Sequence, residues 1–135
     1  MEFKHTINIF ILIVLSFLVN FSSANIGVMP IDTFGFFDTG NSILNDQLPV
    51  RDYWAYTGIT VDYIQSFFFK IFGNNWHSYV IHSSTINTFS TLIFYFFLIE
   101  LKISKFFSLI YALSFAILLY PVSGTPFAYL HAYVF

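Results

Sequence analysis

The apolar positions of the chain gather in three long runs, and a stretch of mixed polarity separates the first run from the other two. The first run covers residues 7–21, or roughly 19 residues if it is extended to 6–24. The second and third runs cover about residues 78–99 and 104–120. Because a helix needs about 20 mostly apolar residues to cross a bilayer, the pattern predicts an all-α integral membrane protein with about three transmembrane helices.

Composition agrees with lipid as the surrounding solvent. Hydrophobic residues make up 57% of the chain, aromatic residues 23% and charged residues 9%, and the mean hydropathy is +0.73. A soluble domain of 135 residues could not bury so much apolar surface. The net charge of −2 leaves no basic patch for nucleic acid, and the lack of cysteine excludes disulfides and thiolate ligands.

The lysines indicate how the runs are oriented. Residues 100–103 are too few for anything but a tight helical hairpin, and Lys102 and Lys105 flank that turn. Positive residues prefer the cytoplasmic side, so these lysines and Lys4 together predict a cytoplasmic N-terminus if three helices alternate across the bilayer. Residues 25–77, which contain five of the seven acids, then form an extracytoplasmic loop.

The two ends of the chain leave alternatives open. Residues 1–24 fit a retained first transmembrane helix, a signal-anchor, and they also fit a cleaved signal peptide, because small residues at 22–24 suit signal peptidase. After the helical hairpin at 78–120, residues 121–135 begin another apolar run that is too short to cross the membrane. We therefore expect the chain to be the N-terminal part of a longer membrane protein.

Two segments of the extracytoplasmic loop have the pattern of interfacial amphipathic helices. Residues 31–44 mix aromatic and acidic positions before a turn-forming Asn-Asp pair, and Asp32 or Thr33 is the expected N-cap. Residues 60–72 set three polar positions against five apolar ones at helical spacing, and a glycine stands near each end. Both segments are expected to lie along the membrane surface.

Small and polar side chains in the second and third runs indicate helix packing. Ser104, Ser108, Ala112 and Ala116 recur every four residues and make a narrow face that another helix can approach closely. Asn87 lies in the second run, where an amide is costly unless it is hydrogen-bonded, so we expect it to face protein. These features predict further transmembrane helices or a homo-oligomer.

Several short motifs follow one another after the first run. They are Asp32, Ile43-Leu44, Pro49-Val50-Arg51-Asp52-Tyr53-Trp54, Tyr63-Ile64-Gln65 and Ile71-Phe72-Gly73. In this order they resemble the GT-C fold membrane glycosyltransferases of the protein mannosyltransferase and aminoarabinose transferase-like family. Members of that family have an Asp-Glu pair after the first helix and Pro-Tyr-Arg-Asp after a horizontal helix. Thr33 stands here in place of the Glu, and the likeness covers about residues 7–120.

The resemblance implies transfer of a sugar from a polyprenyl-phosphate donor to an acceptor on the non-cytoplasmic face of a bacterial inner (plasma) membrane. Asp32 would be the catalytic base that takes the acceptor's proton, or would orient the acceptor. Arg51 and Asp52 would bind the substrate on its phosphate side, because a guanidinium fork matches phosphate oxygens. A local Arg–Asp surface pair is the open alternative. No cofactor is certain: a divalent cation is an option for the leaving phosphate, whereas the scattered histidines predict no metal cluster.

The 135-residue chain alone should be inactive, because the catalytic pocket of such a transferase also includes residues from later loops. The alternative comes from another class: a small non-catalytic integral membrane protein that packs against a larger membrane partner through the small-residue face at Ser104, Ser108, Ala112 and Ala116. A secreted product cleaved at Ala24 is a third interpretation. A reading frame that continues past Phe135 with further spans would favour the transferase.

Overall fold

The structure is a computed structural model that describes residues 2–26, 30–55 and 58–119, with the backbone alone at 2–4 and 30–32. The described residues form five α-helices: α1 (Glu2–Ser23), α2 (Pro30–Leu44), α3 (Ile59–Phe72), α4 (Trp76–Glu100) and α5 (Lys105–Leu119). Since they contain no strand, the prediction of an all-α chain is confirmed for this part. The segment at 121–135, expected to begin a further element, lies outside the described residues.

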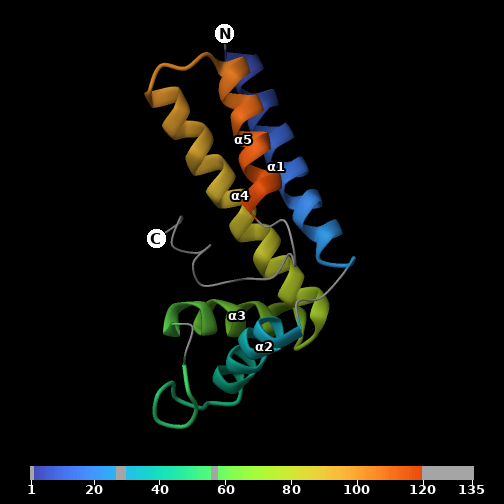
Figure 1. Ribbon diagram of the computed structural model, residues 1–135, viewed down its shortest axis with the longest axis vertical. Coiled ribbons are helices and arrows are strands. Elements are labelled where there is room, and N and C mark those ends of the chain that lie inside the picture. The colour runs from blue at the N-terminus through green and yellow to red at the C-terminus, as the bar shows by residue number, and fades with distance from the viewer. Residues whose placement is uncertain (1, 27–29, 56–57, 120–135) are drawn as a thin grey trace.

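The helices form two parts (Figure 1). α1, α4 and α5 lie side by side and together form what we call the bundle. The N-terminal end of α1 and the turn between α4 and α5 lie at the same end of this bundle. α2 and α3 lie across the other end and, with the loop between them, form the platform (residues 30–72). α4 joins the two parts because it packs against α1, α5 and α3.

The interior of the bundle contains hydrogen-bonded amides and hydroxyls. Asn20 of α1 donates to two serine hydroxyls of α4 at 2.9 and 3.1 Å. Asn87 of α4 donates to the carbonyls of Ser16 in α1 and Ala116 in α5, at 2.9 and 3.2 Å, and so connects three helices. Asn87 is fully buried, which confirms the prediction that it faces protein.

The small-residue face of α5 is covered by the chain's own helices. Ser108, Ala112 and Ala116 are buried, whereas Ser104, just before the helix, is exposed. Ala112 belongs to a core cluster with Leu12 of α1. The face therefore serves helix packing, as expected, and the described part of it packs within this chain.

Length and polarity distinguish the bundle helices as candidates for crossing a membrane. Within the described residues, one segment, His5–Ser23 in α1, is both long enough and apolar enough to do so. α4 has the length, but its serines, threonines and asparagine lower its hydropathy. α5 is apolar and shorter, about 22 Å at 1.5 Å per residue. Three transmembrane helices therefore stay a prediction.

The start of α2 differs from the sequence prediction. Pro30 is its first residue, so Asp32 and Thr33 lie inside the first turns and neither is the N-cap. Proline suits the first helical position because its fixed φ matches the helix and an N–H there would have no helical partner. The other end agrees with the predicted turn, since Asp46 takes a left-handed φ of 61° and closes a Schellman motif.

α3 has its predicted limits, but its polar side is turned inward. Gly58 and Gly73 flank the helix, both with positive φ. The buried side chains of the helix include three polar ones: Asp62, Gln65 and Ser66. Apart from Lys70 in the last turn, the exposed large side chains are apolar or aromatic: Ile59, Tyr63, Phe67, Ile71 and Phe72. Polar side chains of α3 are therefore packed into the platform, and apolar ones cover its outside.

A glycine sets the distance between α2 and α3. A Cβ atom added at Gly40 would stand 2.5 Å from Cγ of Gln65 and 3.3 Å from the ring of Phe69. Neither contact is tolerable without movement, and Gly40 is buried. The two platform helices can approach this closely only because α2 has no side chain at this position.

Candidate functional site

The loop that follows α2 carries the predicted substrate-binding residues. Pro49 forms a bridge with Tyr53, and the N–H of Val50 donates to the carbonyl of Tyr53 at 2.9 Å. The N–H of Asp52 donates to the carbonyl of Leu48, also at 2.9 Å. Val50 has a φ of 70°, a left-handed conformation that is unfavourable for a β-branched residue. The loop is thus tightly folded on itself. Its backbone hydrogen bonds stabilise the unfavourable conformation of Val50.

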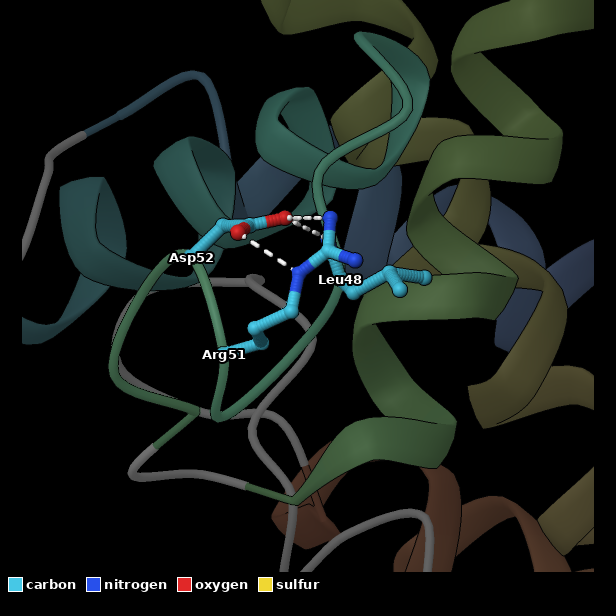
Figure 2. Close-up of polar contacts among 3 residues, drawn as sticks. All are labelled: Leu48, Arg51 and Asp52. Carbon is cyan, nitrogen blue, oxygen red and sulfur yellow. Dashed lines mark hydrogen bonds and ion pairs between the residues drawn. The ribbon is translucent and has the colours of Figure 1, made fainter.

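Arg51 and Asp52 bind each other (Figure 2). Nε of Arg51 donates to one carboxylate oxygen at 2.8 Å and Nη2 to the other at 2.7 Å, while the N–H of Leu48 donates to the second oxygen at 2.8 Å. The hydrogen bonds from Arg51 and, to a smaller extent, from the N–H of Leu48 lower the pKa of Asp52 from its usual 3.8 to about 2. The same pairing raises the pKa of Arg51. Both groups are ionised at neutral pH, and the local pair that the sequence left open is present.

The guanidinium of Arg51 keeps donors for a ligand. Its fork to Asp52 uses two of the five N–H groups that a guanidinium carries. The Arg51 side chain is 67% exposed, against 29% for Asp52. Both residues line an open hollow of about 400 Å³ whose other walls are Val50, Tyr53, Trp54 and Ala55. The hollow therefore offers an exposed cation beside aliphatic and aromatic surface, which suits an anion with an apolar part.

Asp32, the predicted catalytic base, lies at the opposite end of α2 from this loop. It is in the first turn of the helix, and its side chain is outside the described part of the structure. The helix axis rises about 18 Å from Asp32 to Leu44. The described side-chain contacts of Arg51 and Asp52 are with each other and with Leu48. The structure thus brings the predicted substrate-binding residues Arg51 and Asp52 together and describes no contact between them and Asp32.

A buried carboxylate that the sequence analysis did not single out lies behind the loop. Asp62 of α3 is 0% exposed. Thr39 of α2 donates its hydroxyl to Oδ1 of Asp62 at 2.7 Å, and Tyr53 of the loop donates to Oδ2 at 2.9 Å. Burial, and then the bond to Asp62, raises the pKa of Tyr53 well above its usual range, so this hydroxyl stays a donor at neutral pH. One carboxylate therefore connects α2, α3 and the loop that carries Arg51.

Two buried contacts attach the platform to α4. Nδ1 of His82 lies 2.7 Å from Oε1 of Gln65, and the His82 ring stacks on Phe68 with 4.9 Å between ring centroids. Tyr79 donates its hydroxyl to the carbonyl of Thr33 in α2 at 2.8 Å. Because both contacts come from the first turns of α4, they fix the position of both platform helices on the bundle.

Residue spacing shows that α3 has a polar side, but it does not show that this side is buried. Gln65 and Ser66 follow Asp62 by three and four residues, so both lie on the same side of the helix as Asp62. A helix on a water-soluble protein would turn such a side outward. The side faces inward here because Tyr63 and Phe67, 48% and 59% exposed, occupy the outer surface. The signal is visible only when the outer surroundings are taken to be apolar.

The described side chains do not favour a divalent cation at this site. In the part of the chain that the structure describes, no three His, Cys, Asp or Glu residues come together. The oxygens of Asp52 accept from Arg51 and Leu48, and those of Asp62 accept from two hydroxyls. A cation at either carboxylate would have to displace these donors.

Comparison of the chain with protein-family models, with curated proteins and with solved structures finds no match.

Proposed function

We propose that the chain is the N-terminal part of an integral membrane glycosyltransferase that transfers a sugar from a polyprenyl-phosphate donor to an acceptor on the non-cytoplasmic face. The membrane location is supported by a distribution of polar and apolar side chains that is the reverse of the one in water-soluble proteins. Among the described side chains, polar ones outnumber hydrophobic ones in the buried set, while many large hydrophobic side chains are exposed. In lipid this distribution is stable, because apolar side chains meet hydrocarbon and polar groups hydrogen-bond between helices.

The bundle shows the inversion most directly. Phe10 of α1 and Phe106 and Leu118 of α5 are 66%, 65% and 72% exposed. On the inner sides of the same helices, Ser16 and Ser108 are 0% exposed. A bundle with this surface would aggregate in water. The pattern supports α1, α4 and α5 as membrane helices, including the two that length or hydropathy alone does not select.

The arrangement of the ends supports a platform on the outer face. Lys102 and Lys105 lie at the turn between α4 and α5, at the end of the bundle where the chain begins, and the platform lies at the other end (Figure 1). Lysines favour the cytoplasmic side of a membrane. In this orientation the loop with Arg51 faces the non-cytoplasmic side, where a lipid-linked donor and an exported acceptor would meet.

The proposed reaction uses one carboxylate and one guanidinium. Asp32 takes the proton of the acceptor hydroxyl as its oxygen bonds to the anomeric carbon. The bond from that carbon to the phosphate oxygen breaks, and the phosphate leaves with the electron pair. Because the loop with Arg51 lies at the other end of α2 from Asp32, the free donors of Arg51 bind the released polyprenyl phosphate rather than the reacting anomeric centre. Asp52 holds the guanidinium in place, and the bond from Tyr53 to Asp62 holds the loop.

Sugar transfer by a full-length form tests the proposal. Asp32→Asn should reduce transfer to background, measured as radiolabelled sugar moved from the polyprenyl phosphate in isolated membranes, with unchanged protein level. Asp46→Asn is the matched control, because Asp46 is exposed and lies in the turn after α2. Normal transfer by Asp32→Asn would remove Asp32 from the mechanism.

Labelling of an introduced thiol tests the orientation. The chain has no cysteine, so Asp32→Cys gives a unique site. An impermeant maleimide added to intact cells should label it from outside. Labelling that requires access from the cytosol would contradict the transferase.

A further inference from the structure

A groove between α1 and α5 lies at the end of the bundle opposite the platform. Its walls are Ile7 and Asn8 of α1 and Lys105, Phe106 and Leu109 of α5. The enclosed volume is about 360 Å³. The groove is separate from the hollow beside the platform loop, and neither the bundle contacts nor the proposed reaction uses its charged residue.

The upper end of the groove is polar and positively charged. Asn8 holds it in shape, since Nδ2 lies 3.3 Å from the carbonyl oxygen of Lys105 and 3.4 Å from the hydroxyl of Tyr95. Nδ1 of His5 lies 3.2 Å from the same hydroxyl. The Lys105 side chain is half-buried, and its ammonium has no hydrogen bond or ion pair to a described residue. Glu100, at the end of α4, is exposed and makes no described contact with it.

The rest of the groove is apolar. Ile7 is 41% exposed and Phe106 65% exposed. Leu109 stands four residues after Lys105, one turn further into the bundle on the same side of α5. The cation of the groove is therefore bordered by Ile7 and Phe106, and Leu109 continues the apolar surface one turn deeper. A phospholipid has the matching order, with a phosphate at the surface and an acyl chain beneath it.

We infer that this groove binds an anionic phospholipid of the cytoplasmic leaflet, with the phosphate at Lys105 and an acyl chain along Ile7, Leu109 and Phe106. The inference rests on the proposed membrane orientation. Charge complementarity favours this occupant, because basic pockets between membrane helices on the cytoplasmic side are typical sites for anionic headgroups. Lys102, in the adjoining turn, is not among the residues that line the groove, so the charge of the site comes from Lys105. Free phosphate would leave the apolar walls unused.

Lipid titration of the purified chain in detergent, followed by native mass spectrometry, tests the inference. We expect the first lipid adduct to form about fivefold more readily with phosphatidylglycerol than with phosphatidylcholine, the preference that one lysine near anionic lipid provides. Lys105→Gln should reduce the ratio to about one. Lys70→Gln, on exposed α3 of the platform, is the matched control and should keep the native ratio.

The outcomes separate this inference from the membrane proposal. The inference that the groove binds an anionic lipid would be overturned by equal binding of the two lipids to the native chain. A preference that survives Lys105→Gln would overturn it as well. So would a preference lost in Lys70→Gln, because it would place the lipid on the platform. Resistance of the chain to alkaline extraction from membranes is measured in parallel. Extraction into the soluble fraction would refute the proposal that the chain is a membrane protein. An inserted chain without lipid preference would refute only the inference of lipid binding in the groove.

Discussion

The bundle and the platform both bury polar side chains, but they bury different kinds. In the bundle, Ser16, Asn20 and Asn87 are buried, and all three are uncharged. In the platform, Asp62 is fully buried as a carboxylate, and the ion pair of Arg51 and Asp52 lies in the adjoining loop. The polarity of the protein thus increases from the bundle to the platform.

The difference shows what each environment tolerates. An amide or hydroxyl can be satisfied by a carbonyl or hydroxyl of a neighbouring helix, which suits a hydrocarbon-embedded bundle. A carboxylate carries a much larger desolvation penalty and needs several donors nearby. Asp62 has two hydroxyl donors from two different elements. The platform therefore depends on a charged hydrogen-bond centre, and the bundle depends on many weaker contacts.

The largest effect is expected when that centre is removed. Asp62→Leu deletes the acceptor of Thr39 and Tyr53, and each hydrogen bond to a charged group contributes about 1.5–3 kcal/mol. We expect the free energy of unfolding to fall by about 3 kcal/mol, measured by SDS titration with circular dichroism. Asp62→Asn, which keeps one acceptor oxygen, should lose about 1 kcal/mol. A loss below about 1 kcal/mol for the leucine variant would show that Asp62 does not hold the platform together.

Closing the space between the platform helices should have the next largest effect. Gly40→Ala places a Cβ against Gln65 and forces α2 and α3 apart. The overpacking costs about 1–3 kcal/mol, partly offset by the better helix propensity of alanine. A net loss of about 1–2 kcal/mol is expected in the same titration. Asp38→Ala, at an exposed position of α2, is the control and should not destabilise. A more stable Gly40→Ala protein would contradict the close approach.

A smaller effect is expected in the bundle. Asn87→Leu removes two hydrogen bonds, but helix-to-helix hydrogen bonds in membranes contribute on average about 0.6 kcal/mol. The substitution also removes Oδ1 of Asn87, which is buried and has no partner among the described residues. We expect a loss of about 1 kcal/mol by SDS titration. If Asn87→Leu matched or exceeded Asp62→Leu, the contrast between bundle and platform would be wrong.

The smallest effect concerns the exposed loop and its pH dependence. The pKa of Asp52 is lowered from 3.8 to about 2, so the Arg51–Asp52 contact stabilises the folded loop above about pH 4 and is lost as the pH falls through 2. Arg51→Gln should raise this pKa toward 3.8 without reaching it, because Leu48 still donates. Carboxyl ¹³C NMR of labelled aspartate measures the shift. Arg51→Lys should give an intermediate value, and an unchanged pKa in Arg51→Gln would contradict the pairing.

Local signals explain what the sequence could predict of the fold. Gly58 and Gly73 mark the ends of α3, and Asn45-Asp46 marks the end of α2, because each acts through its own backbone conformation. A surface ion pair of Arg51 and Asp52 could likewise be considered from the sequence, because the two residues are adjacent in the chain. Binding of a phosphate by that pair, and catalysis by Asp32, stay predictions.

Long-range partners explain what the sequence could not predict. Asp62 meets Thr39 across 23 positions, and Gln65 meets His82 across 17. These pairings follow from how α2, α3 and α4 pack, and residue spacing within one helix does not contain that information. The inward turn of the polar side of α3 belongs to the same class, because it depends on what surrounds the platform as well as on the helix itself.

The central place of α4 also determines the order in which the protein can be completed on the ribosome. Synthesis delivers α1, α2 and α3 first, and at that stage Asn20 of α1 and Gln65 of α3 have not met their partners on α4. These two side chains on α1 and α3 therefore stay without their α4 partners until the fourth helix is made. The contacts between α2 and α3 can form earlier, because Thr39 and Asp62 both precede α4, whereas the attachment of the platform to the bundle requires α4.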